Sequence, residues 1–300
     1  MSTLTFHGRP VRGIDIHTHV PRRWSAREAS PARVDPREEQ MARYFRSATI
    51  GMTVEEMVEL YRRLELVAVI FDIDKETSSD DPFVGNDYVA EVVQRFPDVF
   101  IGWASVDPWK GRAAVKELER AVTQLGLRGL KLHPITQAFF PNDERFYPLY
   151  AKAQELGIPV LFHTGHTGVG AGTPGGSGLK LKYSRPIPYL DDVAADFPQL
   201  TIIGAHPSWP WQEEMLSVAL HKANVYIDLS GWSPKYFSPS LVQYANTLLQ
   251  DKVLFGSDFP VISPERWLRD FEAAGFRDEV RPKILLENAR RVLKLDAAQP

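Results

Sequence analysis

Short apolar runs alternate along this chain with segments that have helical spacing. The runs are rich in β-branched and aromatic residues, which is typical of buried strands. Eight of them lie at 13–20, 66–73, 99–107, 127–133, 159–164, 200–206, 225–231 and 253–259. Between the runs, apolar residues recur with helical spacing at 54–65, 113–125, 145–155, 211–222 and 239–249.

Several residues mark where these helices begin and end. Thr53 precedes Glu55 and Glu56, as an N-terminal capping residue does. Gly126 and Gly157 directly follow helical segments, where a left-handed residue closes the last turn. These signals support the helix boundaries drawn from periodicity.

Strict alternation of strand and helix predicts parallel strands joined by right-handed crossovers. Eight such units favour a closed barrel. The alternative is a doubly wound open sheet, which usually carries a glycine-rich phosphate turn after its first strand. Here the first strand ends in His-Thr-His instead. We therefore predict the α/β class and a (β/α)₈ TIM barrel, with one domain over residues 1–300.

Two segments interrupt the rhythm of strands and helices. Residues 22–46 are polar and rich in arginine, and residues 167–188 are rich in glycine and proline. Long loops inside a compact domain are often lids or binding loops. Because each follows a strand that ends in histidine, we predict that both are substrate loops.

Composition narrows the class of protein. The 300 residues are 44% hydrophobic and carry a formal net charge of -3, which points to neither a nucleic-acid nor an acidic-membrane partner. No run reaches the roughly 20 apolar residues of a membrane span, and the first ten residues lack the apolar core of a signal peptide. The absence of cysteine excludes thiolate metal ligands. We expect a cytoplasmic globular protein.

Ionisable residues gather where the predicted strands end. Five of the eight histidines lie there, together with a lysine and an aspartate: His17, His19, Lys131, His133, His163, His206 and Asp258. In a barrel of this kind the active site lies at the carboxyl ends of the strands. We therefore expect these side chains to meet at one rim.

A metal site is the simplest reason for this pattern. His17 and His19 are two residues apart and share a face of the first strand. Adding His163 and Asp258 completes three nitrogen ligands and one carboxylate. That set suits one divalent ion with an open water position, first of all Zn²⁺, with Mn²⁺, Fe²⁺ and Co²⁺ as alternatives.

Five motifs, in this order, resemble the amidohydrolase superfamily, in its amidohydrolase-related branch that includes aminocarboxymuconate-semialdehyde decarboxylase. They span nearly the whole chain: Asp15-Ile-His17-Thr-His19, Gly129-Leu-Lys-Leu-His133-Pro, Leu161-Phe-His163-Thr-Gly165, Gly204-Ala-His206-Pro and Leu254-Phe-Gly-Ser-Asp258-Phe-Pro. The resemblance implies the same four ligands, a catalytic role for His206, and an assembly of two or more copies. Roles for Lys131 and His133 stay open.

The reaction expected at such a site begins with a metal-activated water. Asp258 would hold that water, and His206 would polarise a carbonyl group or donate a proton. Basic loop residues, among them Arg22, Arg23, Arg27, Lys180, Lys182 and Arg185, would suit an anionic carrier such as coenzyme A, although a solvated loop explains them equally well.

Two loop sequences resemble hydrolases that cleave 4-hydroxyphenyl-β-ketoacyl-CoA. These are Gly-Ala-Gly-Thr-Pro-Gly-Gly and Asp228-Leu-Ser-Gly-Trp-Ser-Pro-Lys-Tyr-Phe. We therefore rank a metal-dependent hydrolase that cleaves a carbon–carbon bond first, and a decarboxylase of an aromatic or dienoic acid second. A barrel without chemistry is a third reading, against which the complete set of polar residues argues.

Four residues are candidates for contact with a small-molecule substrate. His166 and Arg185 lie in or beside the second long loop, and Trp209 and Trp232 could form an apolar wall. Asp72 and Asp74, near the end of the second strand, could orient a ligand imidazole or cap a turn.

Overall fold

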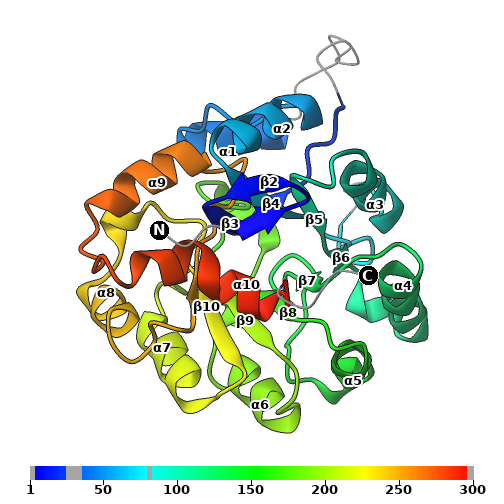
Figure 1. Ribbon diagram of the computed structural model, residues 1–300. Helices are drawn as coiled ribbons and strands as arrows, with labels where there is room; N and C mark the ends of the chain where they lie inside the picture. Colours follow the sequence, from blue (N-terminus) through cyan, green and yellow to red (C-terminus); the bar gives the residue numbers. More distant parts are fainter. Residues whose placement is uncertain (1–3, 25–35, 80–82, 296–300) are drawn as a thin grey trace.

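Parallel strands form a barrel in the computed structural model, which describes residues 4–24, 36–79 and 83–295 (Figure 1). Each of the eight predicted runs contains a strand, and the predicted (β/α)₈ fold is confirmed. The strands are β3 (Gly13–His19), β4 (Leu66–Phe71), β5 (Phe100–Gly102), β6 (Ala104–Ser105), β7 (Leu130–Leu132), β8 (Val160–His163), β9 (Ile202–Ala205), β10 (Val225–Asp228) and β11 (Val253–Leu254).

Hydrogen bonds join these strands around the barrel. The pairings run β3–β4–β5 and β6–β7–β8–β9–β10–β11. At Trp103 the third run changes partner, because the Trp103 amide donates to Ile70 O (3.0 Å) while the Ala104 amide donates to Gly129 O (2.8 Å). Thr18 pairs in parallel with Phe259, which joins the last strand segment to the first.

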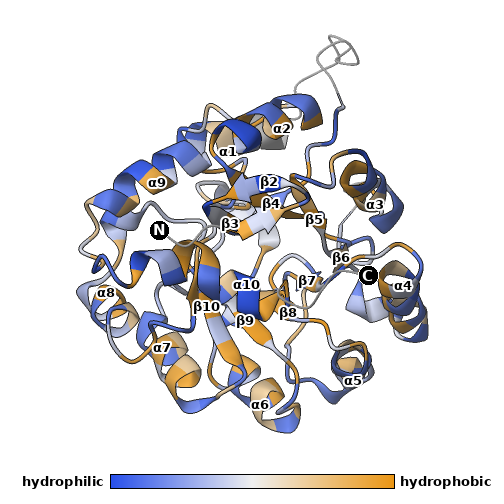
Figure 2. Cartoon of the chain, in the orientation of Figure 1, coloured by the Kyte–Doolittle hydropathy of each residue, from blue (hydrophilic) through white to orange (hydrophobic). Residues whose placement is uncertain are grey.

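Helices surround the strands, with hydrophobic residues on their inner sides (Figure 2). All five predicted helices are present. The helices are α1 (Pro36–Phe45), α2 (Val54–Arg63), α3 (Asn86–Arg95), α4 (Arg112–Thr123), α5 (Tyr147–Glu155), α6 (Tyr189–Asp196), α7 (Gln212–His221), α8 (Pro239–Ala245), α9 (Pro264–Glu272) and α10 (Asn288–Val292), together with short turns η1 (Pro108–Lys110), η2 (Glu144–Phe146), η3 (Pro174–Gly178), η4 (Leu181–Ser184), η5 (Pro234–Tyr236) and η6 (Lys283–Glu287).

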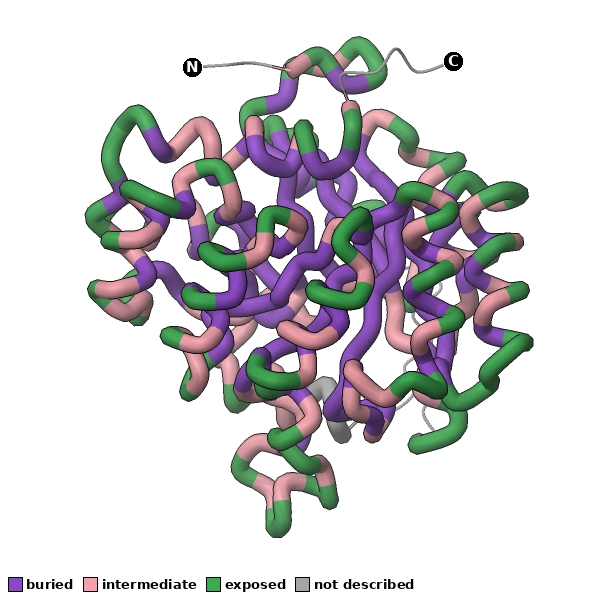
Figure 3. The backbone as a smooth tube through the Cα atoms, turned by 90° about the horizontal axis from the view of Figure 1, so that it is seen from below, coloured by how far each residue is buried: buried purple, intermediate pink, exposed green. Residues whose placement is uncertain are grey.

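The core has two layers because successive strand residues point to opposite faces. In β4, Val67 and Val69 belong to the cluster inside the barrel, whereas Ala68 and Ile70 pack outward against the helices. Both faces are buried, and the strands appear as the buried centre of the molecule in Figure 3. This explains why the strands read as continuous apolar runs rather than alternating ones.

A hairpin closes the end of the barrel where the strands begin. It consists of β1 (Leu4–Phe6) and β2 (Arg9–Val11), which pair in an antiparallel manner. Phe6 and Val11 pack into the cluster inside the barrel, and Arg9 Nη2 donates to Leu66 O at the start of β4 (2.7 Å). The hairpin does not cover the opposite end, where the strands finish and where barrels of this kind carry their active sites.

The structure agrees with the three predicted capping residues, although α8 ends at Ala245, before the predicted end at 249. Thr53 and Glu56 form a capping box at α2, with the Thr53 amide donating to the Glu56 carboxylate (2.7 Å). Gly126 (φ 72°) and Gly157 (φ 66°) adopt the left-handed conformation after α4 and α5. Only glycine takes this conformation without a steric cost at Cβ.

The two long loops contain more structure than the sequence indicated. The prediction of a loop over residues 22–46 is wrong for the last part of that segment, which forms α1. Ser47 and Thr49 hydroxyls both donate to Pro260 O (2.6 Å each), so tertiary contacts hold this segment against the end of the barrel. Residues 167–188 contain the turns η3 and η4. Within the described part of the chain, no helix is long and apolar enough to cross a membrane.

Replacing Gly129 by alanine tests the packing of the two core layers. An added Cβ would lie 2.3 Å from Cδ2 and Cε2 of the Trp103 ring, so we expect a loss of about 1–3 kcal/mol in the free energy of unfolding. Urea denaturation measures it, with Ala113→Ser on the exposed face of α4 as the control, expected within about 0.5 kcal/mol of wild type. A Gly129→Ala protein as stable as the control would contradict this packing.

Candidate metal centre and active site

The ends of β3 and β11 are held together by backbone hydrogen bonds. The Asp258 amide donates to His17 O (2.9 Å), and the His19 amide donates to Phe259 O (2.7 Å). These bonds place the side chains of His17, His19 and Asp258 at the same rim, although the chain separates them by nearly its whole length.

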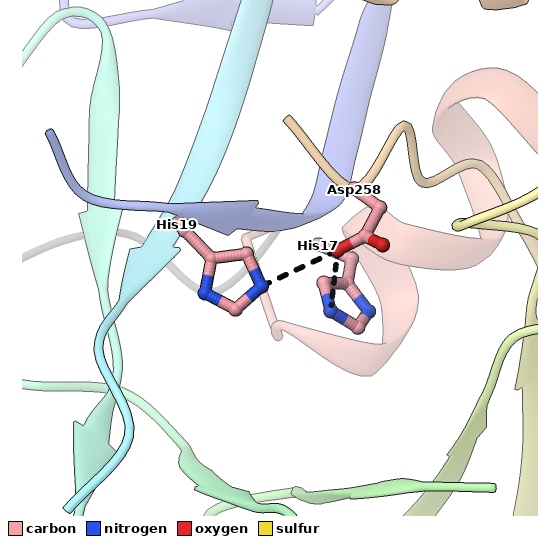
Figure 4. A group of neighbouring side chains, drawn as sticks. All are labelled: His17, His19 and Asp258. Atoms are coloured by element: carbon pink, nitrogen blue, oxygen red, sulfur yellow. Dashed lines mark ion pairs between the residues drawn. The ribbon is translucent and has the colours of Figure 1, made fainter. Parts of the chain in front are cut away.

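Those three side chains converge on one point (Figure 4). Asp258 Oδ1 lies 3.4 Å from His17 Nε2 and 3.3 Å from His19 Nε2. Each of the three residues offers one potential ligand atom, and these atoms all lie within 4.8 Å of one another. Among residues 4–24, 36–79 and 83–295, this is the group of three or more such side chains close enough to hold a metal ion. His17 is fully buried, while His19 is partly open to solvent.

The partners of His17 indicate which of its ring nitrogens carries the proton. His17 Nδ1 lies 2.8 Å from Asp228 Oδ2, and both groups are buried, so Nδ1 carries the proton and donates it. The Nε2 atom then carries a lone pair, which faces the Asp258 carboxylate. Two acceptors repel each other unless positive charge lies nearby. Lys131 Nζ, 3.2 Å from Nε2, supplies part of it, and a divalent cation fits the same donor set.

His163 lies beside this group without belonging to it. Its Nδ1 atom is 2.9 Å from His206 Nε2, and its ring stacks on His133 with 3.9 Å between centroids. The His206 ring in turn lies 5.0 Å from the His17 ring. His163 Nε2 is buried and has no hydrogen-bond partner. A ligand role for His163 therefore stays a prediction.

Two residues of this centre adopt an unusual backbone conformation. His206 has φ 72° and Asp258 has φ 66°, both in the left-handed region that costs residues other than glycine free energy. A Cβ on Gly231 would come within 2.5 Å of His206 Nδ1, so only glycine allows this approach. Such strain tends to persist at functional sites, where the surrounding structure holds it in place.

A second buried network supports the strand ends from below. The Asp15 carboxylate accepts hydrogen bonds from Tyr61 Oη (2.8 Å), Ser257 Oγ (2.5 Å) and the Ser257 amide (2.8 Å). Asp15 is two residues from His17, and Ser257 is next to Asp258. The network therefore couples the two segments that carry the candidate ligands.

The centre opens into a cavity of about 700 Å³. Against two acidic side chains, Asp72 and Asp258, the cavity has seven basic ones, of which Lys131 is the most deeply buried. The seven are Arg22, Arg23, Arg46, Lys75, Lys131, Lys235 and Arg266. This excess of positive charge favours an anionic ligand.

The candidate substrate residues lie in different places. His166 and Trp232 line the cavity, and Trp209 packs against both rings, with centroids 5.4 and 5.9 Å away. Arg185 is absent from the lining, and its Nη2 atom pairs with Glu214 Oε1 (2.6 Å) on α7.

The basic residues suggested for a carrier are also scattered. Arg22 and Arg23 line the cavity, whereas Lys180 borders a separate small pocket and Lys182 lies over the rings of Phe140 and Tyr183. Arg27 lies outside the described residues. The described members of this set do not form one site.

Some residues of the site were missed or misplaced by sequence reasoning. Asp228, not Asp72 or Asp74, holds the His17 imidazole. Asp72 accepts from the Val84 amide (3.0 Å), and Asp74 accepts from the Asp107 amide (2.9 Å). The sequence held one signal for Asp228. It ends strand β10, just as Asp258 follows the last strand, so both residues lie at the rim where the strands end.

Burial dominates the protonation of the histidines. It lowers the pKa of His17, His163 and His206, and so favours the neutral form of each ring. For Lys131 burial lowers the pKa to about 7. Burial alone would raise the pKa of Asp258, but the neighbouring histidines hold it below its ordinary value. Neutral imidazoles and an ionised carboxylate are the forms that bind metals.

A protein-family model described as amidohydrolase matches residues 14–295. The chain belongs to the amidohydrolase family. The resemblance read from the five motifs is thereby confirmed.

The matches to two curated relatives extend over about three quarters of each relative's length. The gamma-resorcylate decarboxylase of Polaromonas sp. (strain JS666) is 24% identical over 250 residues, which are 70% of this chain and 75% of the relative. The 2-keto-4-carboxy-3-hexenedioate hydratase of Sphingobium sp. (strain SYK-6) is 28% identical over 254 residues, 71% of each chain. The hydrolysis of a β-ketoacyl-CoA predicted from loop sequences is therefore wrong, because decarboxylases recur among the relatives instead.

Solved structures agree on the barrel. The uncharacterized TIM-barrel protein Bb4693 of Bordetella bronchiseptica has a TM-score of 0.77 and 27% identity, covering 94% of this chain and 98% of its own. The dihydroxybenzoic acid decarboxylase of Polaromonas sp. JS666, solved with manganese and 2-nitroresorcinol, has a TM-score of 0.63 at 19% identity and covers 95% and 98%. At that identity the second likeness shows the fold alone.

The buried histidines predict how the stability of the metal-free protein depends on pH. Because their pKa values lie below the 6.5 of the unfolded chain, protonation favours unfolding. The contribution of these histidines to the free energy of unfolding should be largest above pH 6.5 and should be lost progressively as the pH falls below that value. Urea denaturation at about pH 8 and about pH 5.5 measures this.

His206→Asn provides the control for that experiment. Burial raises the pKa of Asp15 to about 7, which opposes the trend, and comparison with the variant isolates the histidine contribution. The variant should lose less stability on acidification than the parent. Equal losses in the two proteins would show that His206 does not contribute.

Proposed function

We propose that this chain is a metal-dependent decarboxylase of an aromatic acid. One observation carries the proposal: a group of two imidazoles and a carboxylate, of which His17 and Asp258 are buried, lines a cavity with seven basic side chains. Recurrent decarboxylases among the relatives, including those of gamma-resorcylate, support the reaction class. The expected substrate is a small anionic molecule with an aromatic body, and coenzyme A has no part in it.

His17, His19 and Asp258 would hold the metal, with His163 as the further ligand expected from the sequence. When bound, a divalent ion supplies positive charge that holds the oxygen atoms of an acid and stabilises negative charge that develops on them. Two or three imidazoles and one carboxylate suit Zn²⁺, and the manganese in the Polaromonas structure makes Mn²⁺ the second ion to test.

Loss of CO₂ requires a proton for the carbon that loses it. His206 is the proposed donor, because it lines the cavity and because Asp258 and Asp228 favour its protonated form against the effect of burial. Its proton would bond to the ring carbon that carries the carboxylate. The bond between that carbon and the carboxylate then breaks, CO₂ leaves, and the electron pair restores the aromatic ring. Solvent protons would recharge His206.

The remaining polar lining would bind and orient the acid. Lys131 is fully buried at the floor, where its ammonium group faces His17 and the ring of Phe71. The His133 ring, stacked on His163, borders the same space. Burial strengthens such charge-assisted contacts, since little water competes for the oxygen atoms of the ligand. An assembly of two or more copies stays a prediction.

Purified enzyme, reconstituted separately with Zn²⁺ and Mn²⁺, should release CO₂ from hydroxybenzoic acids such as 2,6-dihydroxybenzoate. We expect the released CO₂ and the decarboxylated phenol in equal amounts, measured by gas analysis and chromatography, with a chelator-treated sample as the blank. Metal retention without CO₂ from a panel of aromatic acids would exclude the reaction. A protein that binds no metal after reconstitution would instead be a barrel without this chemistry.

Two substitutions separate binding of the metal from transfer of the proton. His163→Ala should lose bound metal and turnover together. His206→Ala should keep the metal while turnover falls by about 10²-fold or more. Metal analysis and the rate of CO₂ release measure both, and His221→Ala, on the exposed end of α7, is the control. Metal loss in the His206 variant would make His206 a ligand and contradict this division of roles.

A further inference from the structure

Ser230 contacts two histidines of the proposed active site at once. Its side chain is fully buried, two residues beyond the end of β10. Its Oγ atom lies 2.9 Å from Nδ1 of His17 and 2.9 Å from Nδ1 of His206. Sequence reasoning had assigned Ser230 no role.

The position of this hydroxyl is determined by its neighbours. The Ser230 amide donates to Asp228 Oδ1 (2.6 Å), and the other oxygen of that carboxylate accepts from His17 Nδ1 (2.8 Å). A Cβ on Gly256 would lie 2.8 Å from Asp228 Oδ1 and 2.9 Å from Ser230 Cβ. A larger side chain at position 256 would therefore displace the network. The hydrogen bond to Asp228 and the close packing of Gly256 therefore hold Ser230 in this position.

The two histidines depend on Ser230 to different degrees. His17 has Asp228 as a second partner for its Nδ1 atom, and that partner is charged. For His206, Ser230 is the hydrogen-bond partner of Nδ1 within the described part of the chain, and the Nε2 atom on the other side faces His163. Loss of the hydroxyl would therefore loosen the Nδ1 side of the His206 ring, which would keep its contact with His163, while His17 would keep its charged partner.

We propose that Ser230 is the positioning residue that orients His206 for proton transfer. A hydrogen bond at Nδ1 determines the rotation of an imidazole ring and the direction of its Nε2 atom. Through Ser230, the ring that would deliver the proton is tied to the ring that would hold the metal. The inference rests on the proposed function, since it assigns a role within that reaction.

Ser230→Ala should lower kcat by about 10- to 100-fold, the usual effect of removing the partner that orients an active-site histidine. KM and the dissociation constant for Mn²⁺, measured by titration without substrate, should change less than about threefold because Asp228 still holds His17. Ser230→Thr, which restores the hydroxyl, should recover most of kcat. Loss of Mn²⁺ affinity as large as the loss of kcat would overturn the proposal, since Ser230 would then act through His17.

A double-mutant cycle distinguishes a positioning role from a structural one. If Ser230 acts through His206, Ser230→Ala should have no further effect on kcat in the His206→Ala protein. A structural role would lower kcat by the same factor in both backgrounds, and that result also overturns the proposal. Should Ser230→Ala fail to fold, Ser230→Cys keeps the side-chain volume with a weaker hydrogen bond, and the same cycle applies.

Ser238→Ala is the matched control. The Ser238 hydroxyl accepts from the Leu241 amide at the start of α8 (3.2 Å) and contacts none of the histidines. Its loss should weaken the start of α8 and leave kcat unchanged. The two proposals fail differently: wild-type enzyme that releases no CO₂ rejects the decarboxylase, whereas an active wild type with additive effects of Ser230 and His206 rejects only the role of Ser230.

Discussion

The His17 imidazole lies between two carboxylates, and the functional end of the barrel is arranged around that contact. Asp228 binds one nitrogen at 2.8 Å, and Asp258 faces the other at 3.4 Å. Burying two carboxylates costs free energy unless positive charge or hydrogen bonds compensate for it. Lys131 and the neighbouring hydrogen-bond donors compensate in part, and a divalent cation would complete the compensation. Binding of metal and stability of this end of the fold are therefore linked.

The close approach of these charged and polar groups also explains why glycines lie beside the centre. Three acceptor or donor groups must approach one another closely, so Gly231 and Gly256 lie where a Cβ would collide with the network. His206 and Asp258 adopt left-handed backbone conformations at a cost that the surrounding hydrogen bonds offset. The Asp15 network ties the strand ends together beneath them. These contacts fix the arrangement of the side chains at this end of the barrel, while the loops supply other residues of the cavity lining.

The chemistry within the cavity follows from the balance of charges. Basic side chains outnumber acidic ones in the lining, which favours acids over neutral substrates. The loop sequences favour a thioester hydrolase, but the basic residues proposed to bind its carrier lie apart from one another. Arg185 pairs with Glu214, and Lys182 lies over two aromatic rings. A metal, histidines and a carboxylate can serve several reactions at one type of centre, and the decarboxylases among the relatives support the proposed decarboxylation over hydrolysis.

Chain order and residue type alone predicted the barrel and its rim. Each strand contributes its own apolar run, and the carboxyl ends of parallel strands meet at one end, so His17, His19 and Asp258 could be grouped before any coordinates were known. Local rules also located the caps at Thr53, Gly126 and Gly157. Helix α1 escaped prediction because contacts with distant segments stabilise it, as the hydrogen bond from Gln40 Nε2 to Ala171 O (2.6 Å) shows.

Only the tertiary structure decided which side chains touch. His17 and Asp228 are 211 positions apart, and no periodicity relates them. Whether a basic loop residue faces the cavity or a neighbouring helix depends on how the loops fold back, which separates Arg22 from Arg185. Hydrogen bonds act over about 3 Å, a scale that local sequence patterns do not encode. The sequence by itself determined the fold and the location of the chemistry, whereas packing decided the partners of each functional group.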